Sequence, residues 1–165
     1  MIGTIFLWIL WPSFNAAIGT QLSQPRAIVN TVLSLCGSGL MATAISKLVR
    51  PERKFDMEDF ENATLAGGVA IGSFADFRLN LGGALTVGTV AGTLSVLGFR
   101  YLGPYLRLKM GLKDTCGIHN LHGIPGLIGG VGSIIAARTA SRENYGSEFD
   151  TIFPRGEDQW IAQII

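Results

Sequence analysis

The sequence predicts an all-α membrane protein, a polytopic bundle of transmembrane helices. Only 15% of its 165 residues are charged, against roughly 25% in an ordinary soluble domain. Hydrophobic residues make up 48% of the chain, and 22 glycines add to them. Its long apolar stretches are also apolar or small all round, whereas a helix of a soluble bundle keeps a polar stripe. This combination is typical of closely packed membrane helices.

Five apolar stretches are predicted to be complete spans, because most approach the roughly 20 residues that a spanning helix needs. They cover residues 2–19, 27–46, 62–79, 82–99 and 115–137. The third has a short apolar core and reaches residue 79 only if Asp76 is tolerated in the membrane. Another span is expected to start at residues 160–165. Because the sequence starts and stops within apolar segments, we expect a fragment of a longer polytopic protein.

The basic residues predict the orientation of the spans, since Lys and Arg gather in cytoplasmic loops. The links after the second and fourth spans hold eight of the 13 basic residues. These eight are Lys47, Arg50, Arg53, Lys54, Arg100, Arg107, Lys109 and Lys113. We therefore assign these links to the cytoplasm.

Charge and cysteine content exclude several partner classes. The formal net charge is +1, and no basic stretch is interleaved with aromatic residues, so we expect no nucleic-acid partner. Cys36 and Cys116 form no disulfide framework. Both lie in apolar surroundings, where we expect them to be small buried side chains.

Small residues recur at a spacing of four, which places them on one helix face and lets helix backbones approach closely. The pairs are Gly68 with Gly72, Gly88 with Gly92, and Gly126 with Gly130. This pattern predicts close helix packing and carries no information on a substrate.

The stretch WPSFN in the first span combines a helix-distorting proline with an amide at membrane depth. Helical spacing places Trp8, Trp11 and Asn15 on one stripe, with Phe14 beside it. Phe14 could obstruct a pore and Asn15 could bind a solute in it. A packed aromatic ring and an interhelical hydrogen bond explain the two residues equally well.

The stretch GIHNLHGIPG in the fifth span holds both histidines of the chain, His119 and His122. Ionisable groups within a span face the bundle interior or a cavity and are candidates for function. Helical spacing places His122 on the face of Gly126 and Gly129, which would leave room beside the imidazole. His119 lies about 60° around the helix, so both rings need not line one pore. A packed interhelical histidine remains the alternative.

Metal and enzyme chemistry are disfavoured at the same stretch. Cys116, His119 and His122 are spaced by three, but one helix spreads them over about 120° and cannot close a metal site. No activated nucleophile accompanies them, so we predict no metal, no cofactor and no enzyme activity. Asp114 precedes the stretch, where a carboxylate suits the N-terminal end of a helix.

Three segments together resemble the Rh glycoprotein branch of the ammonium transporter superfamily. They are GTIFLWILWPSFN, NATLAGGVA, and DTCGIHNLHGIPG followed by IGG. The segments occur in the family's order and cover most of the chain.

The resemblance implies the ammonium transporter fold, with about eleven or twelve spans, of which this chain would hold about five. It implies a trimer, either a homotrimer or a heterotrimer with other Rh-family chains, in the lipid bilayer of the plasma membrane. Each subunit of this family has a narrow hydrophobic pore with two histidines from opposite halves. His122 falls on the second, and the first would lie upstream of Met1.

The resemblance also assigns roles to single residues. Phe14 falls on a gate phenylalanine and Asn15 on the neighbouring asparagine, while Asp114 falls on a family aspartate; Trp11 and His119 would support the site. Ile18 stands where bacterial-type ammonium transporters have a cation-binding serine, which matches the Rh branch.

The implied function is passage of ammonia or ammonium, with neutral NH3 crossing the pore, methylammonium as an analogue and CO2 as a further proposed gas. The alternative is a non-conducting structural subunit of Rh type, which the identity of the upstream histidine would distinguish.

Overall fold

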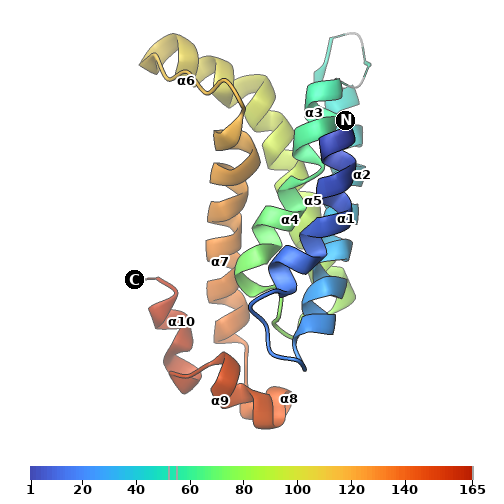
Figure 1. Ribbon diagram of the computed structural model, residues 1–165. Helices are drawn as coiled ribbons and strands as arrows, with labels where there is room; N and C mark the ends of the chain where they lie inside the picture. Colours follow the sequence, from blue (N-terminus) through green and yellow to red (C-terminus); the bar gives the residue numbers. More distant parts are fainter. Residues whose placement is uncertain (52, 55, 165) are drawn as a thin grey trace.

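The computed structural model describes residues 1–51, 53–54 and 56–164, and within them the chain is helical and contains no strand. The helices pack into an elongated bundle, with α1 and α10 on its outside (Figure 1). The predicted all-α class is confirmed.

Three helices of the described residues are long and apolar enough to cross a membrane: Gln24–Val49, Leu81–Met110 and His119–Arg138. The first is α2. The second comprises α5 (Leu81–Leu97), a π-helical turn (Gly98–Leu102) and α6 (Gly103–Met110). The third comprises a π-helical turn (His119–Gly123) and α7 (Ile124–Arg138). The first predicted span, residues 2–19, forms the shorter apolar helix α1 (Ile2–Ala16).

The remaining helical segments are short. They are α3 (Met57–Ala63), α4 (Ala66–Ile71), a 3-10 turn (Gly72–Phe74), α8 (Arg142–Tyr145), a 3-10 turn (Gly146–Glu148), α9 (Phe149–Ile152), a 3-10 turn (Gly156–Asp158) and α10 (Gln159–Ala162). The segment expected to start a span at residues 160–165 contains only the end of α10, and Ile165 lies outside the described residues.

The third predicted span is not one continuous helix. Residues 62–79 contain the end of α3, all of α4 and a 3-10 turn, with an irregular segment after Phe74. The break falls at Thr64, whose carbonyl accepts a hydrogen bond from the Ser38 hydroxyl of α2. Its hydroxyl accepts a hydrogen bond from Trp8 Nε1 at 3.2 Å. Neighbouring helices therefore supply the hydrogen bonds that keep a broken helix stable at this depth.

Three helices, α2, α4 and α5, pack closely against one another. The Ser34 backbone passes between two glycines, Gly67 of α4 and Gly88 of α5, and a Cβ on either glycine would collide with the Ser34 carbonyl. The Ser34 hydroxyl donates a hydrogen bond to the Gly67 carbonyl at 2.8 Å. One turn further along α2, Gly92 of α5 meets Ser38, where a Cβ would lie 2.6 Å from the carbonyl oxygen. The Gly88/Gly92 pair therefore packs as predicted.

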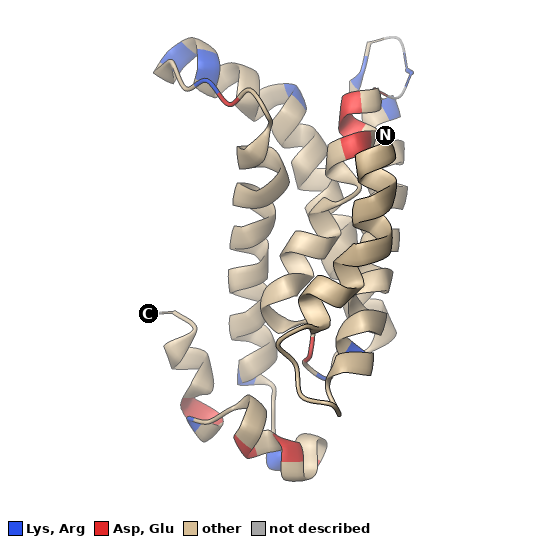
Figure 2. Cartoon of the chain, in the orientation of Figure 1, with Lys and Arg blue, Asp and Glu red and all other residues tan. Residues whose placement is uncertain are grey.

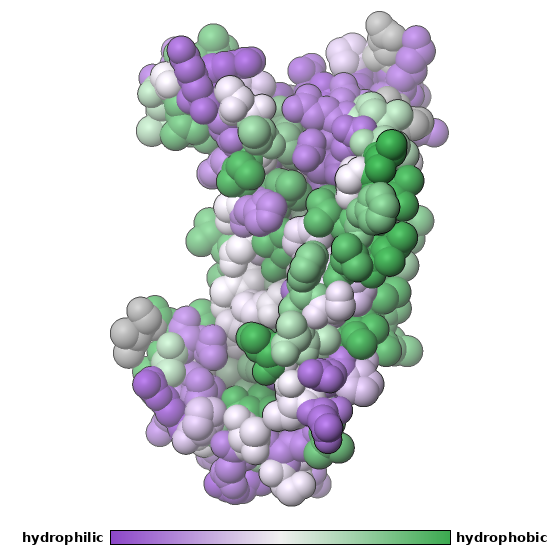
Figure 3. Space-filling view, viewed as in Figure 1, coloured by the Kyte–Doolittle hydropathy of each residue, from purple (hydrophilic) through white to green (hydrophobic). Residues whose placement is uncertain are grey.

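Polar and apolar side chains occupy different regions of the outer surface of the bundle. Hydrophobic side chains cover the middle of the molecule along α1, and hydrophilic ones gather at its two ends (Figure 3). Lys and Arg of the α2–α3 link and of α6 lie at one end, and those around α8 and α9 lie at the other (Figure 2). The basic residues of the two links assigned to the cytoplasm thus lie at one end of the bundle, and those around α8 and α9 lie at the opposite end.

The segment after α7 folds back on the end of the bundle opposite α6. Its aromatic rings pack against one another and against Phe77, edge to face in the two closest pairs. The centroids of Phe77 and Phe153 lie 4.9 Å apart, and those of Tyr145 and Phe153 lie 5.0 Å apart. Glu148 anchors the segment: its Oε2 accepts hydrogen bonds from Arg78 Nη2 at 2.9 Å and from Arg26 at 3.3 Å. The side chain of Glu148 is only 11% exposed.

Acid is expected to release this segment. The hydrogen bond from Arg78, with the nearby Arg26 charge, holds the pKa of Glu148 below its usual range. The stabilisation is therefore complete above the ordinary glutamate pKa, near about 4.3, and is lost as the pH falls through the lowered folded-state value. We expect faster hydrogen exchange in residues 141–158 at acid pH, after correction for the intrinsic exchange rate.

In this experiment Glu148→Gln should raise exchange at neutral pH and remove its acid dependence. Asp150→Asn is the matched control, because the Arg142–Asp150 pair is exposed and such pairs contribute little. Acid-independent exchange in the unmodified protein would show that Glu148 does not anchor the segment.

Candidate functional site

Three of the predicted site residues lie together on one open face of the bundle. The Trp11 ring lies between Phe14 and His122, with centroid distances of 6.4 Å to Phe14 and 6.3 Å to His122. Phe14 is 57% exposed and His122 is also exposed, whereas Trp11 is half-buried. Residues more than a hundred positions apart in the sequence therefore form one aromatic group at the junction of α1 and α7.

Glycines of α4 position the α1 side of this group. A Cβ on Gly68 would lie 2.6 Å from Trp11 Cδ1, and one on Gly72 would lie 3.2 Å from Asn15 Oδ1. A side chain at residue 68 would displace the Trp11 ring, and one at residue 72 would press on the Asn15 amide. The Gly68/Gly72 pair therefore packs against α1.

Asn15 is engaged in an interhelical hydrogen-bond network. Its Nδ2 donates to Thr31 Oγ1 of α2 and to the Gly68 carbonyl of α4, both at 3.0 Å. Thr31 Oγ1 in turn donates to the Ala27 carbonyl at 2.7 Å. This arrangement matches the structural explanation of the amide, in which Asn15 fixes α1 against its neighbours and thereby orients Phe14.

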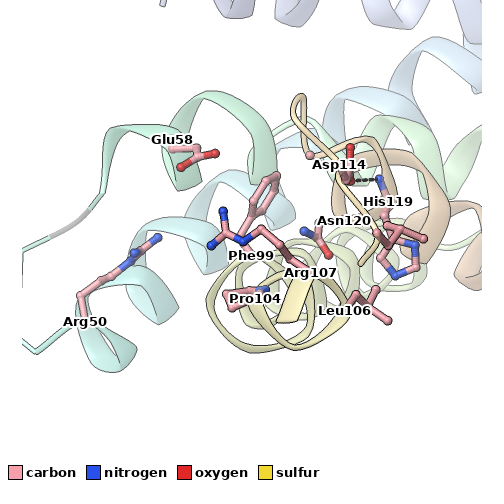
Figure 4. A pocket seen from close by; sticks show the side chains of 12 residues that line it. Arg50, Glu58, Phe99, Pro104, Leu106, Arg107, Asp114, His119 and Asn120 are labelled. Atoms are coloured by element: carbon pink, nitrogen blue, oxygen red, sulfur yellow. Dashed lines mark hydrogen bonds between the residues drawn. The ribbon is translucent and has the colours of Figure 1, made fainter. Parts of the chain in front are cut away.

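On the α7 side, Asp114 organises the chain before His122. One carboxylate oxygen accepts a hydrogen bond from the backbone amide of Ile118 at 3.0 Å. The other accepts one from the backbone amide of His119 at 2.8 Å (Figure 4). The carboxylate thus occupies the position that the positive end of a helix favours. Gly117, which is buried and has a φ of 66°, lies in the turn between Asp114 and Ile118.

His122 lies in a π-helical turn formed by residues 119–123, directly before the regular helix α7. Gly129 packs on α4, where a Cβ would lie 2.6 Å from the Ala70 carbonyl oxygen. Gly126 and Gly130 have no neighbouring atoms within 4 Å of a Cβ. Among the described residues, a side chain at either position would therefore point into open space along α7.

His119 lies in a different environment from His122. It lines a cavity of about 180 Å³ together with Asn120, Asp114 and Arg107 (Figure 4). Its Nε2 atom and Asn120 Oδ1 are buried without a hydrogen-bond partner among the described residues. The structure thus separates the two histidines, as the sequence predicts.

Sequence reasoning did not single out Asn120. Its amide packs against the other π-helical turn, where a Cβ on Gly98 would lie 2.5 Å from Asn120 Oδ1. A buried amide between two helices is a polar group that must be accommodated. Asn120 could have been found from the sequence, because it is the asparagine in the stretch that holds both histidines.

The cysteine prediction was wrong. Cys36 and Cys116 are free thiols, and both are exposed. Cys36 lies on the outward face of α2, beside the buried Leu35 and Gly37. Among the residues the structure describes, no three His, Cys, Asp or Glu side chains are placed to hold a metal ion.

The chain is similar in sequence to known ammonium transporters of the Rh type. The chain is 49% identical over 167 residues to ammonium transporter Rh type B of Danio rerio, which covers 99% of this chain and 36% of the relative. It is 55% identical over 137 residues to ammonium transporter Rh type A of Canis lupus familiaris, covering 82% and 33%. It is 52% identical over 149 residues to ammonium transporter Rh type C of Homo sapiens, covering 90% and 31%. The chain thus spans about a third of the length of these relatives.

Solved structures share its fold. Rh50 of Nitrosomonas europaea matches with a TM-score of 0.78 and 45% identity, over 81% of this chain and 35% of that one. A sensor Amt protein matches with a TM-score of 0.70 over 98% of this chain and 37% of that one, at 20% identity, which supports the fold alone. The sequence model of the Ammonium Transporter Family matches residues 1–165. The resemblance to the Rh branch is confirmed, and this multi-pass membrane chain belongs to the Ammonium Transporter Family.

Proposed function

We propose that the full-length protein carries ammonia across a membrane, and that Phe14 and His122 line its path. The observation that carries this proposal is the open aromatic face, where Trp11 packs against both an exposed phenylalanine and an exposed imidazole. The family assignment and the names of the relatives, which are ammonium transporters, support the same substrate.

The chemistry of the face favours the neutral form of the substrate. An ammonium ion would lose its hydration shell beside apolar rings at a large free-energy cost, whereas ammonia loses far less. A neutral imidazole has one donor and one acceptor nitrogen, so His122 can hydrogen-bond ammonia in passing. The proton would leave on one side of the membrane and be regained on the other. Neutral CO2 would avoid the same cost, and methylammonium would serve as an analogue of the substrate.

Ile18 is consistent with this mode of transport. It is exposed near the end of α1 and offers no hydrogen-bond acceptor to a cation. We therefore propose weak recruitment of ammonium at this end and no tight external site. Assembly as a homotrimer, or as a heterotrimer with other Rh-family chains in the plasma membrane, belongs to the same proposal.

The test is ammonia entry into proteoliposomes that contain the full-length protein and an internal pH dye. Ammonia entering alone consumes protons and raises the internal pH. We expect His122→Ala to slow this rise by about tenfold, the effect of about 1.4 kcal/mol on the barrier, because the imidazole that this chain contributes to the face is lost. His119→Gln is the matched control and should leave the rate unchanged, since His119 lines the separate cavity.

Phe14→Ala is the companion variant, because it removes the exposed ring and retains the helix. We expect it to increase methylammonium entry relative to ammonia, since methylammonium is the bulkier solute. Unchanged rates for both His122→Ala and Phe14→Ala would contradict the assigned path. A protein without any ammonia flux would support the non-conducting alternative.

A further inference from the structure

The helix that begins with α5 is longer than a membrane requires. Residues Leu81–Met110 form a continuous helical run of 30 residues, about 45 Å at 1.5 Å per residue. The hydrocarbon core of a bilayer is about 30 Å thick. The helix exceeds the thickness of the core by about ten residues. It must therefore tilt, or one end of it must leave the hydrocarbon core.

The chain bends where that excess begins. The π-helical turn Gly98–Leu102 joins α5 to α6, and π-turns are among the identifiable causes of helix bends. α6 runs outward from the bundle, away from the direction of α5 and α7 (Figure 1). The segment is thus directed across the end of the bundle.

One face of α6 is apolar and exposed. No residue of α6 is buried, and Tyr105 and Leu108, three positions apart, are 57% and 80% exposed. Tyr101, one turn earlier, is 56% exposed and continues the stripe. The opposite side, which includes Leu106 and Arg107, lines the cavity described above (Figure 4). α6 therefore covers the cavity with one side and leaves its aromatic side free.

The charges along this segment all have one sign. Arg100, Arg107, Lys109 and Lys113 are basic, and no acidic residue occurs from residue 77 to residue 113. On a helix Lys109 lies on one flank of the Tyr105–Leu108 stripe and Arg107 on the other. Long basic side chains can keep their charge in water while their stems cover apolar surface. This is the pattern of a helix that lies in a membrane interface.

We propose that α6 is an interfacial helix whose Tyr105–Leu108 stripe enters the membrane surface and whose basic residues bind anionic phospholipid headgroups. The distribution of basic residues assigns this end to the cytoplasm, where the leaflet carries anionic lipid. Interfacial tyrosine suits the same depth. Each basic residue near such a surface strengthens binding by about fivefold.

The experiment uses the full-length protein with a polarity-sensitive fluorophore on Leu108→Cys, in a background without the exposed thiols of Cys36 and Cys116. The protein is placed in nanodiscs of phosphatidylcholine with increasing fractions of phosphatidylserine. We expect the emission to shift to the blue as phosphatidylserine increases, and added salt to reverse part of the shift. The triple variant Arg107→Gln, Lys109→Gln, Lys113→Gln should weaken the response by about fivefold for each charge removed.

The control variant removes the same number of charges from the opposite end, as Arg138→Gln, Arg142→Gln and Arg155→Gln, and should leave the shift intact. An apolar signal that ignores lipid charge would overturn the proposal and indicate that another helix or subunit covers the stripe. A water-like signal in every lipid would overturn it as well.

Discussion

We expect Gly88→Ala to lower the free energy of unfolding by about 3 kcal/mol, one of the largest effects of adding a single methyl group to this chain. The new Cβ would collide with the Ser34 carbonyl of α2. Gly67 of α4 packs against the same carbonyl. The strain must therefore separate α5 from α2 and disturb the contact of α2 with α4.

The direction of the stability change distinguishes a collision from an ordinary glycine-to-alanine substitution. Alanine is a better helix former than glycine by about 1 kcal/mol, so without a collision the substitution would stabilise the protein. Gly126→Ala is the matched control, since a Cβ there meets nothing within 4 Å. Thermal unfolding of the full-length protein in detergent should place Gly88→Ala well below the parent and Gly126→Ala at or above it. Equal midpoints for the two variants would show that α2 is not held as described.

The glycine pairs also show what the sequence can and cannot predict about helix packing. A spacing of four identifies a smooth helix face, and two of the three pairs meet another helix within the chain. Gly126 and Gly130 have the same spacing and meet nothing in this chain. Whether a smooth face meets a helix depends on partners from distant parts of the fold, which the local pattern does not contain.

The candidate site was likewise predictable from the sequence only in part. The residues were found because ionisable and amide groups are rare in apolar spans, and the aromatic stripe of α1 follows directly from helical spacing. The break at Thr64 was not predictable, because it depends on hydrogen bonds with Ser38 and Trp8, both remote in sequence. Long-range hydrogen bonds were thus a feature that sequence reasoning lacked.

Trp11 provides the second large expected effect, and it can be separated from a loss of stability. Trp11 and Trp8 both lie half-buried on α1 against the same cluster, which includes Leu35 and Leu65. Both rest on a glycine, Trp11 on Gly68 and Trp8 on Gly39 of α2. We therefore expect Trp11→Ala and Trp8→Ala each to lower stability by about 3 kcal/mol.

Only one of the two rings touches the proposed path. Trp11 contacts Phe14 and His122, whereas Trp8 donates its Nε1 hydrogen to Thr64 Oγ1. Trp11→Ala should therefore slow ammonia entry by about tenfold or more, as a barrier increase of about 1.4 kcal/mol would, while Trp8→Ala should leave the rate per folded protein close to that of the parent. Trp11→Phe should restore most of the flux, because a ring would again separate Phe14 from His122. If both alanine variants slow entry equally, the aromatic group acts through the stability of α1, and Trp11 has no separate role in holding the path open.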